Sequence, residues 1–179
     1  MFNEDSRVKI PAILHLCRLG YTYIPKSKQD RLEENNIFPD IFKRSISKIN
    51  PQISEEEIQR LLTDVSLKLN YDDLGREFFR SLVNSSGTKL IDFENFNNNE
   101  FHVTTELTCK KGDEEFRPDI TVLINGMPLV FIEVKKPNNR EGVIAERNRI
   151  NKRFALKDFR AFTNVTQLML FSNNMEYED

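Results

Sequence analysis

Three charged residues interrupt an otherwise apolar stretch, "RPDITVLINGMPLVFIEVKKP", which runs from residue 117 to residue 137. Asp119 lies near its start, and Glu133 and Lys135 lie near its end. Charge at the end of a buried strand is costly unless another group compensates it. Two neighbouring carboxylates can hold a divalent cation such as Mg²⁺, which prefers oxygen ligands. A lysine beside them can stabilise developing phosphate charge or help to orient and deprotonate an attacking water. Together these groups could hydrolyse a phosphodiester.

The context of these residues favours such a site over the simpler alternative, an exposed strand end that carries a Glu–Lys pair. The three residue types alone decide little, because at this loose spacing they occur about once by chance in a chain of this length. Glu133 and Lys135 lie two positions apart, however, so they point to the same face of a strand. They also end an apolar run at the carboxyl end of that strand, where sites of α/β proteins tend to form.

The pairing register of the hairpin decides whether Asp119 can join them. The two apolar segments flank the Asn-Gly dipeptide 125–126, which is typical of a two-residue turn. Uniform pairing from that turn would set Asp119 opposite Ile132, facing away from Glu133. A three-residue loop over 125–127, or a β-bulge near Asp119, would set it opposite Glu133 instead. We therefore predict that the hairpin is not a uniformly paired two-residue form.

The scaffold that must position these residues changes its hydrophobic period halfway along the chain. The first half has helical periodicity. Ser54 is a suitable N-cap, and Glu57 completes a capping box with it. Pro11 either kinks the first helix or begins its regular part. The second half reads strand, strand, strand, helix, strand, which indicates a sheet with one crossover connection. We expect an α/β fold with a mixed central β-sheet flanked by helices and a mainly helical N-terminal half. The expected helices cover 8–20, 54–69, 74–84 and 141–156, and the expected strands cover 101–109, 119–124, 128–134 and 166–172.

Composition and length indicate one globular domain. The chain has 179 residues, of which 39% are apolar and 30% are charged. No apolar run approaches the roughly 20 residues that span a bilayer. The opening "MFNEDSRVKI" has acids where a signal peptide needs a basic and then an apolar stretch. Cys17 and Cys109 lack metal-type spacing, so we expect buried or unreactive thiols in a cytoplasmic protein.

A basic segment follows the candidate site. Residues 135 to 160 contain nine basic and three acidic residues, although the whole chain has a formal net charge of −2. A basic helix beside the site could contact a nucleic-acid backbone, and a solvated helix face is the alternative. The candidate DNA-binding residues are Lys136, Arg140, Arg147, Arg149, Lys152 and Arg153.

Asp119 after Pro118, followed at a distance by Glu133-Val134-Lys135, resembles the PD-(D/E)xK nuclease signature. Longer stretches carry a more specific likeness, to the N-terminal nuclease region of type I restriction enzyme R subunits. These stretches are the hairpin segment, "LIDFENFNNNEFHVTTELT", "QLMLFSNN", "NEDSRVKIPAILHLCRLGYTYI" and "NIFPDIFKRSISKINP". The likeness therefore covers nearly the whole chain.

The resemblance implies a restriction-endonuclease-like fold and a type I site-specific deoxyribonuclease. Its activity would be a Mg²⁺-dependent endonuclease, with Mn²⁺ as a substitute, that cuts unmodified double-stranded DNA. By position, Asp119 and Glu133 would be metal ligands with the main-chain carbonyl of Val134, and Lys135 would be the catalytic lysine. Glu4 matches an acidic residue that the family often places on its first helix, as a further metal ligand. The implied partners are DNA and the modification and specificity subunits of a type I restriction-modification complex.

One departure from the family pattern concerns the helix after the lysine. Many members carry Gln-x-x-x-Tyr there, whereas this chain reads "AERNRINKRFAL". Glu146, Arg147, Asn148 and Asn151 remain alternatives for the role of that motif, which is thought to help hold DNA at the site.

A second departure concerns ATP. The chain contains no Gly-x-x-x-x-Gly-Lys-Ser/Thr loop, so ATP would act only through translocase domains of the full subunit, which are absent here. We expect one nuclease domain over residues 1–179, with a helical subregion at about 25–85 and a nuclease core formed by about 1–24 and 86–179. The alternative function is a catalytically silent DNA-docking or assembly module with the same fold.

Overall fold

A five-stranded mixed sheet forms the centre of the molecule, in a computed structural model that describes residues 5–84, 86–111, 114–136 and 140–173. The outer pairs β1–β2 and β6–β7 are parallel, and the inner pairs β2–β5 and β5–β6 are antiparallel. The predicted α/β fold with a mixed, helix-flanked sheet is confirmed. In sheet order the strands are β1 (Thr22–Ile24), β2 (Phe101–Thr105), β5 (Ile120–Ile124), β6 (Met127–Val134) and β7 (Leu168–Ser172).

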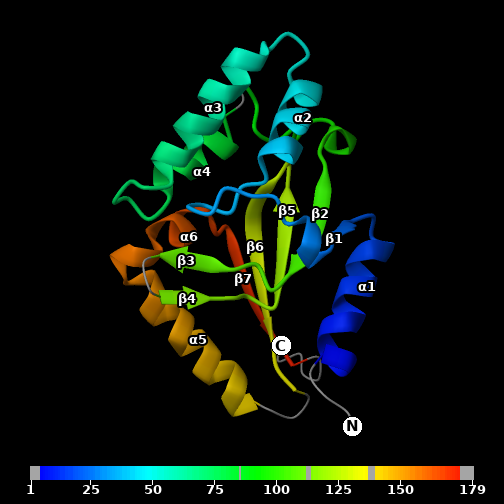
Figure 1. Cartoon of the computed structure of the whole chain (residues 1–179), viewed down its shortest axis with the longest axis vertical. Coiled ribbons are helices and arrows are strands. Elements are labelled where there is room, and N and C mark those ends of the chain that lie inside the picture. The colour runs from blue at the N-terminus through cyan, green and yellow to red at the C-terminus, as the bar shows by residue number, and fades with distance from the viewer. Residues whose placement is uncertain (1–4, 85, 112–113, 137–139, 174–179) are drawn as a thin grey trace.

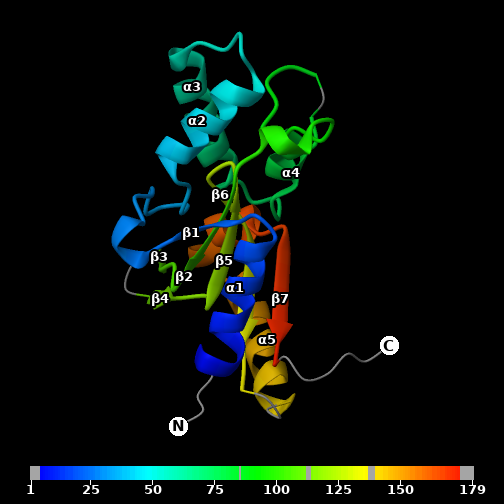
Figure 2. The same cartoon turned by 90° about the vertical axis from the view of Figure 1, so that its right-hand side faces the viewer.

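Helices cover the two faces of this sheet unequally (Figures 1 and 2). One face is covered by α1 (Ile10–Arg18), which follows a π-helical turn, η1 (Asp5–Lys9), and packs over a small apolar cluster that includes Val103 and Val134. The other face carries α5 (Arg140–Phe154) and α6 (Arg160–Val165), which lie on the crossover between the parallel strands β6 and β7. This second face also carries the larger core cluster.

Three helices of the N-terminal half pack beyond the turn end of the central hairpin, at the top of Figure 1. They are α2 (Pro39–Ile49), α3 (Glu55–Lys68) and α4 (Arg76–Leu82). The predicted capping box begins α3, since Ser54 accepts a hydrogen bond from the Glu57 backbone and the Glu57 side chain accepts one from Ser54. Among the described residues, no helix is both long enough and apolar enough to cross a membrane.

Short elements escaped the sequence analysis, because segments of three to six residues carry no readable period. They include β1, the hairpin of β3 (Cys109–Lys111) with β4 (Glu114–Phe116), and α6. The predicted strand over 101–109 was wrong in extent, since the chain leaves the sheet after Thr105 and Glu106 adopts a φ of 53°. Short 3₁₀ turns, also outside the predicted elements, cover Lys26–Lys28 (η2), Phe96–Asn98 (η3) and Lys157–Phe159 (η4).

The register of the β5–β6 hairpin changes partway along it. Asn125 and Gly126 have φ values of 52° and 79°, and Ile124 pairs with Met127, so the turn itself is the tight two-residue form. The pairing then shifts between Leu123 and Val122. The longer-loop alternative is therefore wrong, and the predicted β-bulge is confirmed.

The residue that the bulge accommodates is Leu129. On one side of it Leu123 pairs with Pro128, and on the other Val122 pairs with Val130 and Ile120 with Ile132. Continuing this register by one residue sets Asp119 opposite Glu133. The bulge lies farther from Asp119 than the sequence suggested, but it has the required effect on which face Asp119 occupies.

Candidate active site

Asp119 and Glu133 meet on the α5 face of the sheet. The Val134 backbone N–H donates a hydrogen bond of 2.8 Å to Asp119 Oδ2, which fixes that carboxylate against the end of β6. Glu133 is buried, with 6% of its surface exposed, and it lies within hydrogen-bonding reach of Asp119. The structure thus brings together the two acids that the sequence analysis singled out.

The charge of Glu133 is poorly compensated by the protein. The pKa of Glu133 is raised to about 8, chiefly by burial and then by the nearby charges of Asp119 and Glu146, although the charge of Lys135 acts in the opposite direction. A carboxyl in this position would be stabilised in its ionised form by a cation placed between it and Asp119.

Lys135 is held by an acid from α5. Its Nζ lies 3.4 Å from Glu146 Oε2, and the Lys135 side chain is 20% exposed. Glu146 is itself buried and also pairs with Arg149 at 3.0 Å and with Arg153 at 3.9 Å. Of the alternatives for the missing Gln-x-x-x-Tyr motif, Glu146 is the one that lies at the site, whereas the remaining three are exposed: Arg147, Asn148 and Asn151.

A second lysine reaches the site from the opposite side. Lys9, at the end of η1, has its Nζ 3.4 Å from Asp119 Oδ1 and in contact with Glu106. Burial alone would lower the pKa of Lys9, but the hydrogen bond to Glu106 and the charge of Asp119 raise that pKa above its usual value. Lys9 is therefore a permanently charged neighbour of the candidate metal ligand.

Apart from Lys9, these groups line one polar cleft of about 370 Å³. Its wall also includes the β3–β4 hairpin, where the Phe116 ring lies 4.3 Å from the Arg153 guanidinium carbon and stacks under it. The residues that line the cleft are Glu106, Glu115, Phe116, Arg117, Asp119, Glu133, Lys135, Glu146, Arg149 and Arg153.

The donor set fits Mg²⁺ only as part of an incomplete coordination shell. In the described parts of the chain, no three His, Cys, Asp or Glu side chains are arranged to hold a metal ion by themselves. Mg²⁺ usually keeps several waters and binds proteins through one or two carboxylates together with substrate phosphates. In the buried pair Asp119 and Glu133, the pKa of Glu133 stays raised despite the charge of Lys135, so the pair suits that mode of binding.

The predicted DNA-binding residues separate into two groups. Arg149 and Arg153 line the cleft. Lys136, Arg147 and Lys152 are exposed and do not line it. Arg140 begins α5, but its side chain lies outside the described residues, as does the whole of Glu4, the predicted extra ligand.

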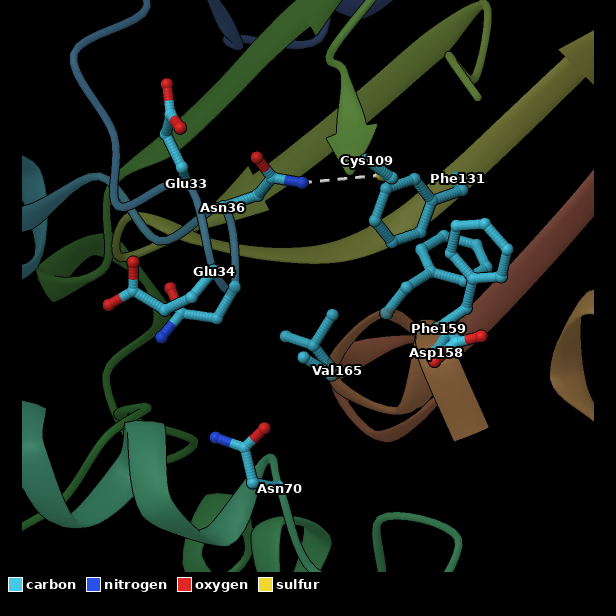
Figure 3. A pocket seen from close by; sticks show the side chains of 12 residues that line it. Glu33, Glu34, Asn36, Asn70, Cys109, Phe131, Asp158, Phe159 and Val165 are labelled. Carbon is cyan, nitrogen blue, oxygen red and sulfur yellow. Dashed lines mark hydrogen bonds between the residues drawn. The ribbon is translucent and has the colours of Figure 1, made fainter. Parts of the chain in front are cut away.

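A separate cavity of about 210 Å³ is lined by both apolar and polar side chains, among them Cys109 of β3 (Figure 3). Its walls include Phe131 and Phe162, and the Cys109 thiol accepts a hydrogen bond of 3.4 Å from the Asn36 amide. The Phe116 ring packs edge-on against Phe162, with centroids 4.7 Å apart. Phe162, which lines this cavity, thus packs against Phe116, which lines the polar cleft. None of the charged residues that line the polar cleft also lines this cavity.

Sequence reasoning missed Lys9 and Glu106. Both are ordinary charged residues far from Asp119 in the chain, and no local pattern marks them. The only signal was indirect: the resemblance drew attention to an acid, Glu4, on the first helix, and a lysine from the turn that follows it reaches the site.

Comparison with known proteins identifies the family of the chain. The sequence profile described as "Type I restriction enzyme R protein N terminus" matches residues 1–178. A candidate type I restriction enzyme endonuclease subunit (MjaIXP) of Methanocaldococcus jannaschii is 28% identical over 97% of this chain and 19% of its own length. The type I restriction enzyme SauMSSORF170P endonuclease subunit of Staphylococcus aureus is 30% identical over 87% of this chain and 15% of its own length. The HindI endonuclease subunit of Haemophilus influenzae is 28% identical over 56% of this chain and 11% of its own length.

The chain therefore spans about a fifth or less of the length of these relatives. The profile nevertheless matches almost every residue of it. The chain belongs to the family of type I restriction enzyme R protein N-terminal regions.

Proposed function

We propose that this chain is the Mg²⁺-dependent nuclease domain of a type I restriction enzyme R subunit, which hydrolyses phosphodiester bonds of unmodified double-stranded DNA. The observation that carries the proposal is the β-bulge at Leu129. It turns Asp119 to the face that bears Glu133 and Lys135, and a uniformly paired hairpin would have kept these residues apart.

The roles follow from the contacts of each side chain. Asp119, held by the Val134 N–H, and Glu133 would hold the metal with the Val134 carbonyl. A bound Mg²⁺ would polarise the scissile phosphate and lower the pKa of an attacking water. Lys135, steadied by Glu146, would donate hydrogen bonds to a phosphate oxygen or to that water.

DNA would enter along the α5 side of the cleft. Arg149 and Arg153 would contact the phosphates nearest the site, and more distant backbone contacts would come from Lys136, Arg140, Arg147 and Lys152. Modification and specificity subunits would complete a cytoplasmic restriction-modification complex, in which ATP would act through the translocase portion of the full R subunit.

The first test is metal binding by calorimetry. We expect Mn²⁺ or Mg²⁺ to bind the wild-type chain, and we expect Asp119→Ala and Glu133→Ala to abolish that binding. A matched control is Glu115→Ala, which removes an exposed acid that also lines the cleft but is assigned no ligand role. A wild-type chain that binds neither ion would favour the catalytically silent docking module instead.

The second test uses the assembled complex, because the isolated domain need not cleave by itself. Lys135→Ala should lower DNA cleavage by about 100-fold or more while ATP hydrolysis and translocation persist. Cleavage at the wild-type rate would show that Lys135 has been given the wrong role.

A further inference from the structure

Lys9 lies among three carboxylates. Its Nζ is 3.3 Å from Asp5 Oδ1 and 3.4 Å from Asp119 Oδ1, and it contacts Glu106 Oε1. The Lys9 side chain is only 13% exposed, so this is no solvated surface pair. An ammonium group surrounded in this way occupies the kind of oxygen-lined position that cations take in proteins.

The two oxygens of Asp119 have different neighbours. Oδ2 accepts the Val134 N–H, on the side of Glu133, and Oδ1 faces Lys9. Lys135, the other lysine of the site, is engaged with Glu146 instead. Asp119 thus stands between the positive charge of Lys9 on one side and the poorly compensated acid Glu133 on the other.

The backbone at Glu106 supports this arrangement. Glu106 has a φ of 53°, a conformation in which glutamate is uncommon and which tends to occur at functional sites. Its N–H donates a 3.3 Å hydrogen bond to the Asp119 carbonyl oxygen. The conformation breaks β2 away from the sheet and directs the Glu106 side chain toward Lys9.

We propose that the Lys9 ammonium takes the place of a second metal ion beside Asp119, so that the site binds one divalent cation, between Asp119 and Glu133. This inference rests on the function proposed above. Lys9 is then a positioning residue: it orients Asp119 and repels a second ion, and it does not touch the substrate. The simpler reading is an ion pair that only ties the first helical segment to the sheet.

Metal stoichiometry separates these readings without any measurement of cleavage. We would titrate the 179-residue chain with Mn²⁺ by calorimetry and count bound ions by electron paramagnetic resonance. The wild type should bind one ion. Lys9→Ala removes the ammonium group from among the three carboxylates, which do not hold an ion by themselves, and should admit a second ion whose coordination shell is completed by water. Lys9→Met fills the same space with neutral atoms, and Lys9→Arg restores the charge, so both should bind one.

Lys9→Met adds a second readout. It removes a positive charge close to the bound ion, so it should bind that ion about tenfold more tightly than the wild type. Lys9→Arg should have nearly wild-type affinity. The control is Lys68→Met, which removes a half-buried lysine paired at 2.6 Å with Asp64 on α3, away from the site. It should change neither the number of bound ions nor the affinity for them.

Each outcome has a defined meaning. Two ions in the wild type, or a single ion bound by Lys9→Ala with wild-type affinity, would overturn the inference and leave the proposed function standing. No ion in the wild type would refute the proposed function and the inference with it. Circular dichroism would establish that each variant is folded, and the wild-type stoichiometry is decisive even if Lys9→Ala does not fold.

Discussion

The buried acid Glu133 should make the metal-free protein less stable as pH rises. Its pKa is raised from 4.5 to about 8 in the folded protein, chiefly by burial and by the charge of Asp119. Between these two values the folded chain binds more protons than the unfolded chain, so the free energy of unfolding falls across that window and levels off above it. At about 1.4 kcal/mol for each pKa unit, the whole effect is about 5 kcal/mol.

Glu133→Gln isolates this effect, because glutamine has nearly the same shape and cannot ionise. The variant and the wild type should differ least near pH 4.5, where Glu133 is protonated in the folded state. By about pH 8.5 the variant should have gained roughly 4 kcal/mol relative to the wild type. Urea unfolding in the presence of a chelator, repeated across this range, measures the difference at each pH.

Two comparisons sharpen the test. Adding Mg²⁺ at high pH should stabilise the wild type and not the variant, since only the ionised carboxyl gains from the cation. Glu100→Gln should show the opposite pH dependence, because the Arg44 hydrogen bonds lower the pKa of Glu100. The Glu100→Gln variant should be less stable than the wild type at neutral pH, and this difference should vanish as pH falls through the lowered pKa of Glu100. A Glu133→Gln difference that stays constant or shrinks with rising pH would refute the reasoning.

Two further predictions concern the hairpin turn and the thiols. Gly126→Ala should lower the free energy of urea unfolding by on the order of 3 kcal/mol. Gly126 has a positive φ, and an added Cβ would lie 2.7 Å from the Phe38 carbonyl oxygen. Gly20→Ala, where φ is also positive but the space is open, should cost less, and equal losses would contradict the steric argument. Burial raises the pKa of the Cys109 thiol to about 12, so one thiol, that of the half-buried Cys17, should react with a disulfide reagent in the folded chain and two after unfolding. Two thiols reacting at one rate in the folded chain would show that Cys109 is accessible.

The chemistry of the candidate site was largely readable from local sequence. Asp119, Glu133 and Lys135 stand out because charges interrupt an apolar run, and alternation along a strand places the last two on one face. The capping box at Ser54 was equally readable, because it depends on residues three apart. Such features are determined by neighbours in the chain, so a single sequence is enough to identify them.

The sequence indicated which hairpin register a metal site would require, but it could not show how the chain achieves that register. A bulge that accommodates an ordinary residue such as Leu129 needs no glycine and leaves no mark in the sequence. The tertiary structure limits the choice, since the start of α2 packs directly against the turn: Phe38 N–H donates to the Gly126 carbonyl at 2.9 Å. That close approach leaves the tight turn in place, so the extra residue is absorbed within the strand.

The sequence by itself determined which residues could do chemistry, and the tertiary structure decided which of them meet. Lys9 and Glu106 join Asp119 because η1 lies against the sheet where β2 ends beside the start of β5, a contact between distant parts of the chain. Glu146 was one of four alternatives until the packing of α5 buried it beside Lys135. The physical reason is the same in each case: side-chain identity and period are local, whereas the packing that brings distant charges together depends on the whole core.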